Sequence, residues 1–246
     1  TNKNWWNRRC IKISSTILPD IRLLYSTLDE SVNDHILSAW TRPIGCIVKR
    51  DPTSIALSDA AYTGLGGWSP DFQFFWRLTR ADMVACNFDM KIVADYESEP
   101  TFHDDKGLHI NILEFVAIIV NLWLCIWFIR KEHDKPGGHV LLLRSDNTSA
   151  LSWLRHAARC HSRPVRNLAY LAHALFIFSG IFNYSQLTSS HIKGDLNVEA
   201  DACSRPEKFL SLDCAIEQFS QLQTCQHFRL PYGLLSRIAT ILSSPR

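Results

Sequence analysis

Hydrophobic residues along the chain fall into short runs, which predict strands, and longer periodic stretches, which predict helices. The run HVLLLRSD at 139–146 is continuous, as expected of a strand that is buried on both faces. Further strands are predicted at 54–60, 72–78 and 183–193, and the GLGG sequence at 64–67 is interpreted as a turn. Helices are predicted at about 112–132, 148–158, 165–180, 197–205, 212–222 and 232–242.

The stretch from Ile112 to Arg130 is nearly all apolar, so a membrane span has to be considered. Only fifteen residues separate Glu114 from Arg130, with Asn121 among them, whereas about 20 are needed to cross a bilayer. We therefore expect a helix that is buried on most sides. Asn111 followed three residues later by Glu114 is typical of a capping box at its start.

The order of the elements is strands first, then helix, strand, helices, strand and helix, which predicts an α/β layer with some parallel pairing. Residues 1–50 are expected to be a helical lead-in or connection rather than a domain. The α/β domain is expected at 51–206, with the polar and acidic segment 80–107 as an insertion or long loop. Residues 207–246 are expected to form a helical tail that leads to a further domain.

Composition narrows the class of protein. Apolar residues make up 46% of the 246 residues and charged residues 20%, so the chain can bury a sizeable core. The net charge of +2 means that any nucleic-acid contact must come from local clustering. The eight cysteines include no C-x-x-C pair, and we expect mostly buried, reduced thiols in a cytoplasmic or nuclear protein that is not secreted. Because the sequence opens at Thr1, we expect a piece of a longer polypeptide.

Four acidic residues lie at the ends of predicted elements. Asp59 and Asp146 each end an apolar strand, Asp201 lies in the first turns of a closing helix, and Glu114 lies in the first turn of the apolar helix. Each acid also has a purely structural interpretation, as a strand end, a capping residue or a first-turn acid favoured by the helix dipole. If the four converge, their repulsion is usually relieved by two hard divalent cations, typically Mg²⁺ with Mn²⁺ as an alternative, and such a pair suits phosphodiester hydrolysis.

Four segments, in order along the chain, carry a resemblance to a known family: SDAAYTGLGGW, INILEFVAI, LLLRSDNTSALSWL and HIKGDLNVEADACSRP. They resemble the successive motifs of the RNase H domain of reverse-transcribing elements, and their sequences are most similar to those of tyrosine-recombinase retrotransposons of the DIRS class. The resemblance covers about 54–206. It implies an RNase H-like, five-stranded mixed sheet flanked by helices, with the Asp-Glu-Asp-Asp set of the family on Asp59, Glu114, Asp146 and Asp201.

The resemblance implies a metal-dependent endoribonuclease that cuts the RNA strand of an RNA/DNA hybrid. Asp59 would bridge two Mg²⁺ ions, Asp146 would hold the ion that activates the attacking water, and Glu114 and Asp201 would complete the pair. The expected neighbours in the polyprotein are an upstream reverse transcriptase and a downstream domain, for which a recombinase is one candidate, and no membrane is involved.

Basic residues cluster in the stretch RHAARCHSRPVR at 155–166, which begins within the predicted helix at 148–158. Arg155, Arg159, Arg163 and Arg166 are candidates for gripping phosphate, and Lys193 is a weaker one, although a solvated helix face is the ordinary explanation of such a run.

Two alternative functions stay open: a catalytically inactive RNase H-like connector, and an integrase- or resolvase-type nuclease acting on DNA. The family's usual loop histidine is missing after Lys193-Gly194, and His191 is expected to be a strand-end residue without a catalytic role.

Overall fold

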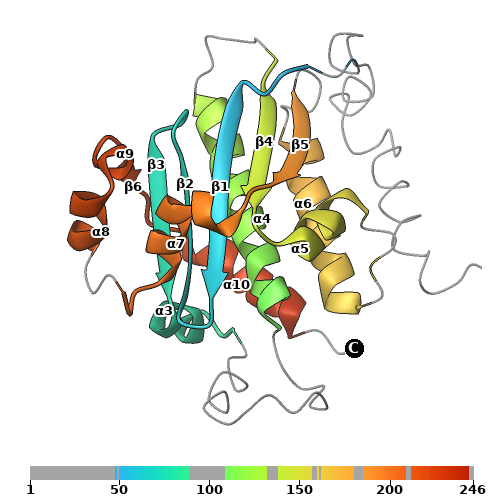
Figure 1. Cartoon of the computed structure of the whole chain (residues 1–246). Coiled ribbons are helices and arrows are strands. Elements are labelled where there is room, and N and C mark those ends of the chain that lie inside the picture. Colours follow the sequence, from blue (N-terminus) through green and yellow to red (C-terminus); the bar gives the residue numbers. More distant parts are fainter. Residues whose placement is uncertain are drawn as a thin grey trace, which may run out of the picture.

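The computed structural model describes residues 48, 50–88, 109–131, 138–156, 160, 162–179, 185–208 and 212–243. The predicted lead-in, apart from Val48 and Arg50, and residues 89–107 of the predicted insertion lie outside this part of the chain. The described residues form an α/β fold in which helices flank a mixed sheet of six strands (Figure 1).

The strands lie in the order β5-β4-β1-β2-β3-β6. Their bounds are β1 Ser54–Ala61, β2 Gly64–Ser69, β3 Phe74–Thr79, β4 Val140–Ser145, β5 Gln186–His191 and β6 Gln226–His227. Strands β1 to β3 form an antiparallel meander, whereas β4 pairs with β1, β5 with β4 and β6 with β3, all in parallel. The expected number of five strands was wrong, because the two-residue β6 is too short to show a pattern of its own.

Helices cover both faces of the sheet. On one face lies α4 (Ile110–Lys131), which contacts β1 and is backed by α5 (Thr148–Arg155) and α6 (Arg163–Phe178). The other face carries α7 (Val198–Ser204), which packs on β1, β2 and β3 and crosses the front of the sheet in Figure 1. The remaining described helices are α3 (Arg80–Ala85), η4 (Gly194–Leu196), α8 (Leu212–Gln218), α9 (Ser220–Gln223) and α10 (Tyr232–Leu242).

Helix α4 is long and apolar enough to cross a membrane by length and composition alone. In the structure it is the central core helix, with Phe115, Ile118 and Leu122 fully buried between the sheet and the neighbouring helices. This surrounding explains why α4 is apolar on all sides, and it confirms the expected buried helix. Because α4 begins at Ile110, Asn111 lies inside its first turn, so the predicted capping box is wrong.

The GLGG sequence at 64–67 is the start of β2 rather than the expected turn, and the turn occupies residues 62–63. A Cβ on Gly66 would lie 2.4 Å from the carbonyl carbon of Cys203 in α7. A Cβ on Gly67 would lie 2.6 Å from a side-chain oxygen of α4. Glycine is required at both positions because helices press on both faces of β2. In the sequence, such closely spaced glycines look the same as those of a turn.

The described start of the predicted insertion is the short helix α3. Thr79 and Asp82 form a capping box at its N-terminus, in which each side chain bonds the other residue's backbone N–H. Six residues are too few to show a helical period, so the sequence did not reveal this helix.

The described part of the predicted tail packs on the domain. Strand β6 extends the sheet, and α10 buries Leu234, Leu235 and Ile238 in the main core. The thiols of Cys86, Cys125, Cys160 and Cys203 are free and buried, as expected, whereas those of Cys214 and Cys225 are not fully buried.

Candidate metal centre

The site forms where the parallel strands β1 and β4 separate. Their pairing ends at Leu57, although β1 continues to Ala61. Beyond this point two backbone groups of β1 are bound by side chains instead of a strand. The amide Nδ2 of Asn197, next to α7, donates to the carbonyl of Ser58 over 3.0 Å, and the N–H of Ala60 donates to Oε1 of Glu114 over 3.2 Å. Side chains from both faces of the sheet therefore occupy the gap between the strands.

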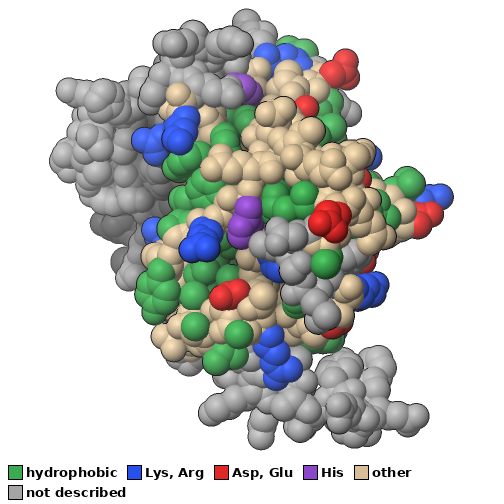
Figure 2. All heavy atoms as spheres, turned by 90° about the vertical axis from the view of Figure 1, so that its left-hand side faces the viewer, with side chains coloured by type: hydrophobic (Ala, Val, Ile, Leu, Met, Phe, Trp, Pro, Cys, Tyr) green, Lys and Arg blue, Asp and Glu red, His purple; other side chains and the backbone are tan. Residues whose placement is uncertain are grey.

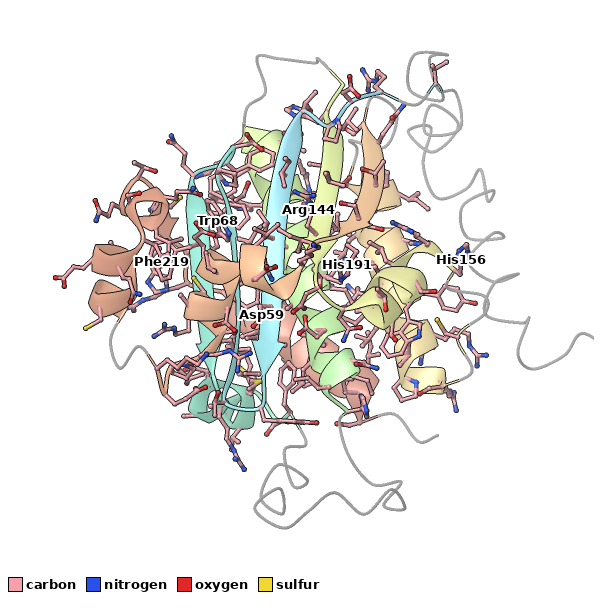
Figure 3. The ribbon with its side chains drawn as sticks, viewed as in Figure 1. Asp59, Trp68, Arg144, His156, His191 and Phe219 are labelled. Carbon is pink, nitrogen blue, oxygen red and sulfur yellow. The ribbon has the colours of Figure 1, made fainter. Side chains whose placement is uncertain are left out.

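Three carboxylates meet at this gap. Asp59, Glu114 and Asp146 each offer an oxygen, and these oxygens all lie within 4.8 Å of one another. The Ser204 hydroxyl of α7 donates to Oδ2 of Asp59 over 2.5 Å, and the Ser145 hydroxyl donates to Oε2 of Glu114 over 3.3 Å. Figure 3 shows Asp59 in the middle of the sheet beside α7. A strand, the core helix and the end of a second strand thus fix one ligand each.

Burial and mutual repulsion raise the pKa values of two of these acids. Burial raises the pKa of Asp59 to about 6, where the charges of Asp146 and Asp201 also raise it and the Ser204 hydrogen bond lowers it. Burial raises the pKa of Glu114 to about 9, and the charges of Asp59 and Asp146 add to the effect. Such a cluster is costly when ionised, and hard cations that prefer oxygen ligands, such as Mg²⁺, would compensate it.

Asp201 lies on α7 outside this group of three. Its carboxylate accepts a hydrogen bond from Nε of Arg205 and forms an ion pair with Lys208 over 3.5 Å. Its side chain is 30% exposed, and its charge reaches Asp59, whose pKa it raises. The structure therefore brings together three of the four expected acids and places the fourth beside them.

The bonds of Glu114 go to the sheet and not to the start of its own helix. Its two oxygens accept from Ala60 and Ser145, whereas the Asn111 amide oxygen accepts from Nδ2 of Asn147 over 2.8 Å. This arrangement overturns the structural interpretation of Glu114 as a capping partner of Asn111. The acid is instead built into the gap between β1 and β4.

Sequence reasoning missed the residues that hold these acids. Asn197 occupies the N-cap position of α7, but its side chain bonds Ser58 instead of the helix. Ser204 gave no signal in the sequence, because a serine in a helix is usually unremarkable. Gly194 approaches the cluster closely, since a Cβ there would lie 3.1 Å from Oδ2 of Asp146.

The predicted basic residues differ from one another in burial and in their contacts. Arg155 binds Ser189 of β5, through Nε to its hydroxyl over 2.9 Å and through Nη2 to its carbonyl, so it ties α5 to the sheet edge. Arg159 lies outside the described residues. Arg163 is exposed and Arg166 half-buried in the first turn of α6. Lys193 is exposed and directly precedes Gly194, where a Cβ would lie 3.1 Å from Oδ2 of Asp146.

A cleft of about 380 Å³ lies at the opposite edge of the sheet, where β3, α3, β6 and α10 meet. Its lining includes Arg77, His227 and Arg229 together with Asp82 and several apolar residues. Figure 2 faces this edge and shows basic, histidine and hydrophobic side chains close together. The Arg77 guanidinium donates to the carbonyls of Ala202 and Cys203, so it mainly secures the end of α7.

Comparisons of the chain with protein families, with curated proteins and with solved structures find no match. The function has to be inferred from the geometry of the site.

Proposed function

We propose that this chain is a metal-dependent endoribonuclease, a ribonuclease H that hydrolyses the RNA strand of RNA/DNA hybrids. The observation that carries the proposal is the meeting of Asp59, Glu114 and Asp146 within 4.8 Å where two parallel strands separate. Three acids from three different elements, two of them buried, are a costly arrangement that is best explained by cation binding.

The arrangement of elements supports an RNase H-like fold as the finer description of this α/β domain. Three antiparallel strands are followed by a core helix, a parallel strand, two helices, a further parallel strand and a closing helix. This is the order on which the resemblance to reverse-transcribing elements rests. The proposal includes a retroelement polyprotein with an upstream reverse transcriptase and a downstream domain, for which a recombinase is a candidate, in the cytoplasm or nucleus.

The donor set fits a pair of Mg²⁺ ions, with Mn²⁺ as an alternative. Asp59, Glu114 and Asp146 would hold them, and Asp201 would complete the set from its position on α7. When bound, the ions supply Lewis acidity and an activated water for an in-line attack on a phosphodiester.

The chain's own residues orient the carboxylates. The Ser204 hydroxyl fixes one oxygen of Asp59, while Ala60 and Ser145 each bind one oxygen of Glu114. Because these partners lie on the sheet and on α7, the acids are held in place before any ligand arrives, which lowers the cost of reorganisation. The start of η4 at Gly194 lies close to Asp146 and restricts the room around its carboxylate.

A cleavage assay tests the proposal. The purified chain is incubated with end-labelled RNA annealed to DNA, with Mg²⁺ or with EDTA, beside single-stranded RNA and duplex DNA. We expect cleavage of the hybrid only, and only with the metal. Cleavage of duplex DNA in preference to the hybrid would replace this function with an integrase- or resolvase-type nuclease.

A catalytically inactive connector is the second candidate, and one observation favours it. Asp201 is engaged by Arg205 and Lys208 instead of joining the other acids. A connector would bind Mg²⁺ weakly and leave the hybrid intact. Arg205→Met distinguishes the two candidate functions. Freeing Asp201 should change the cleavage rate of an enzyme, whereas a connector should leave the hybrid intact with or without the substitution.

A further inference from the structure

Arg144 occupies the strand that leads to Asp146, and its side chain lies on the same face of the sheet as Asp59. In the register it stands between Leu57 of β1 and Ser190 of β5. Leu57 packs in the small hydrophobic cluster under α7, and cross-strand neighbours point to the same face. Asp59 follows Leu57 by two residues, so it shares this face about 7 Å further along the strand. Figure 3 shows Arg144 above Asp59 in this view.

The charge of Arg144 is not used by the acids around it. Its Nε donates to the Ser190 hydroxyl over 3.2 Å, and the ion pairs within the described residues are those that Asp201 makes with Arg205 and Lys208. The cation that lowers the pKa of Asp59 is Arg205. Arg144 is thus a half-buried guanidinium that forms no ion pair with a described carboxylate.

A nucleic-acid strand that approaches three clustered carboxylates is repelled by them, so fixed positive charge beside the cluster is needed in addition to any cation within it. Arginine suits this task, because its planar fork binds phosphate through two parallel hydrogen bonds. Ser190 holds Nε and leaves the terminal nitrogens free to bind, which orients the fork before the ligand arrives.

We propose that Arg144 binds a phosphate of the nucleic-acid strand next to the one that reacts, and so sets the register of that strand over Asp59 and Asp146. This inference rests on the proposed function and names a substrate contact for that site. Arg144 lies outside the basic stretch that the sequence singled out, and the strand context of HVLLLRSD conceals it.

The test measures binding without cleavage. The full chain carrying Asp146→Asn is titrated with a fluorescent RNA/DNA hybrid in Mg²⁺, and the dissociation constant is followed from about 50 to 200 mM salt. Adding Arg144→Met should weaken binding about tenfold at low salt and reduce the slope of log affinity against log salt by about 0.9, the value of one lost phosphate contact. Arg144→Lys should restore most of the slope, because it keeps the charge.

Two control variants separate binding from structure. Ser190→Ala removes the tether and keeps the guanidinium, so the slope should stay unchanged. Arg130→Met removes an exposed arginine sixteen residues beyond Glu114 on α4, about 24 Å away, and should also leave the slope unchanged.

The proposal is overturned if adding Arg144→Met leaves the slope of log affinity against log salt as it is in the Asp146→Asn chain and lowers the melting temperature as Ser190→Ala does. Arg144 would then only tie β4 to β5. Failure of the proposed function gives a different result. If Arg144→Met reduces the slope but the natural chain does not cleave the hybrid, the phosphate contact is supported and the ribonuclease function is refuted.

Discussion

Oε1 of Glu114 accepts the backbone N–H of Ala60 over 3.2 Å, joining the core helix to a strand 54 residues earlier in the chain. Ala60 lies beyond the point where β1 pairs with β4, so Glu114 supplies the acceptor that a neighbouring strand would otherwise provide. The same side chain is therefore part of the sheet's hydrogen bonding and part of the proposed metal site. Its two roles can be separated by substitution.

We expect Glu114→Gln to abolish hybrid cleavage and to fold normally, since glutamine keeps an oxygen for Ala60 but loses the charge that a cation needs. Glu114→Ala should also abolish cleavage and in addition cost about 1–3 kcal/mol in unfolding free energy, because the N–H of Ala60 and the Ser145 hydroxyl lose their acceptor. Urea denaturation and the cleavage assay measure the two effects. Equal stability of the two variants would contradict the structural role.

Asp59→Asn and Asp146→Asn should each abolish cleavage, while thermal stability without metal stays level or rises, because one charge leaves a repelling cluster. Asp195→Asn is the matched control, since Asp195 is exposed on η4 six residues before Asp201 and should be dispensable. Melting curves in EDTA and initial cleavage rates give the comparison. An Asp59→Asn chain that unfolds, with its remaining folded fraction fully active, would show that Asp59 is structural.

The strands and helices with a clear period were predicted well from the sequence. Strand β4, expected at 139–146, spans Val140–Ser145, and the core helix expected at 112–132 spans Ile110–Lys131. Local periodicity carries this information because each element buries one consistent face or is buried all round. The order of elements along the chain then indicated the α/β layer.

The remaining features depend on contacts between distant residues. The glycines of β2 looked like a turn because the sequence does not show the helices that press on them. Glu114 looked like a cap because its partner Ala60 lies 54 residues away. Arg155 binds Ser189 of the edge strand, a contact that appears only once β5 is placed, whereas its expected role in binding phosphate stays a prediction.

The raised pKa values predict how stability without metal depends on pH. Asp59 titrates near 3.8 in an unfolded chain and at about 6 in the fold, and Glu114 near 4.5 and at about 9. The folded state therefore holds these protons more tightly, so their contribution is fully present below about pH 4 and is lost as the pH rises towards about 9. In EDTA, the unfolding free energy of the natural chain should fall relative to Asp59→Asn/Glu114→Gln as the pH rises.

Added Mg²⁺ should reverse this trend, because a cation favours the ionised acids. Urea denaturation of the natural chain and the double variant at about pH 5, 7 and 9, with Mg²⁺ or with EDTA, gives four profiles of unfolding free energy against pH. If the difference between the natural chain and the double variant does not change with pH in EDTA, the two acids are not a strained cluster.

The close packing of α7 on Gly66 of β2 predicts that a larger residue at position 66 displaces α7 and, with it, Asp201. Gly66→Ala would place a Cβ 2.4 Å from the backbone of Cys203, so α7 must move outward. We expect a loss of about 2–3 kcal/mol in unfolding free energy, together with a lower cleavage rate, because Asp201 and Ser204 lie on that helix. Gly233→Ala is the matched control: nothing lies within 4 Å of its Cβ, and alanine in α10 should add about 0.5–1 kcal/mol. An unchanged melting temperature for Gly66→Ala would mean that α7 does not press on β2.

His191 tests whether the site needs a protein acid in addition to its carboxylates. It is the exposed last residue of β5, as the sequence predicted, and it pairs in register with Ser145 of β4. The backbone of the next residue, Ile192, donates to the Ser145 carbonyl, so the chain is still held by the sheet at this point and His191 does not lie on a loose loop. A histidine fixed in this way cannot swing to a leaving group as a loop histidine does.

We therefore expect His191→Ala to lower the turnover number by less than about tenfold, whereas loss of a positioned general acid costs about 10² to 10⁴. Single-turnover cleavage of the hybrid by the natural chain, His191→Ala and His191→Gln measures the effect. A loss of a hundredfold or more in both variants, with melting temperature and metal requirement intact, would show that His191 takes part in the chemistry.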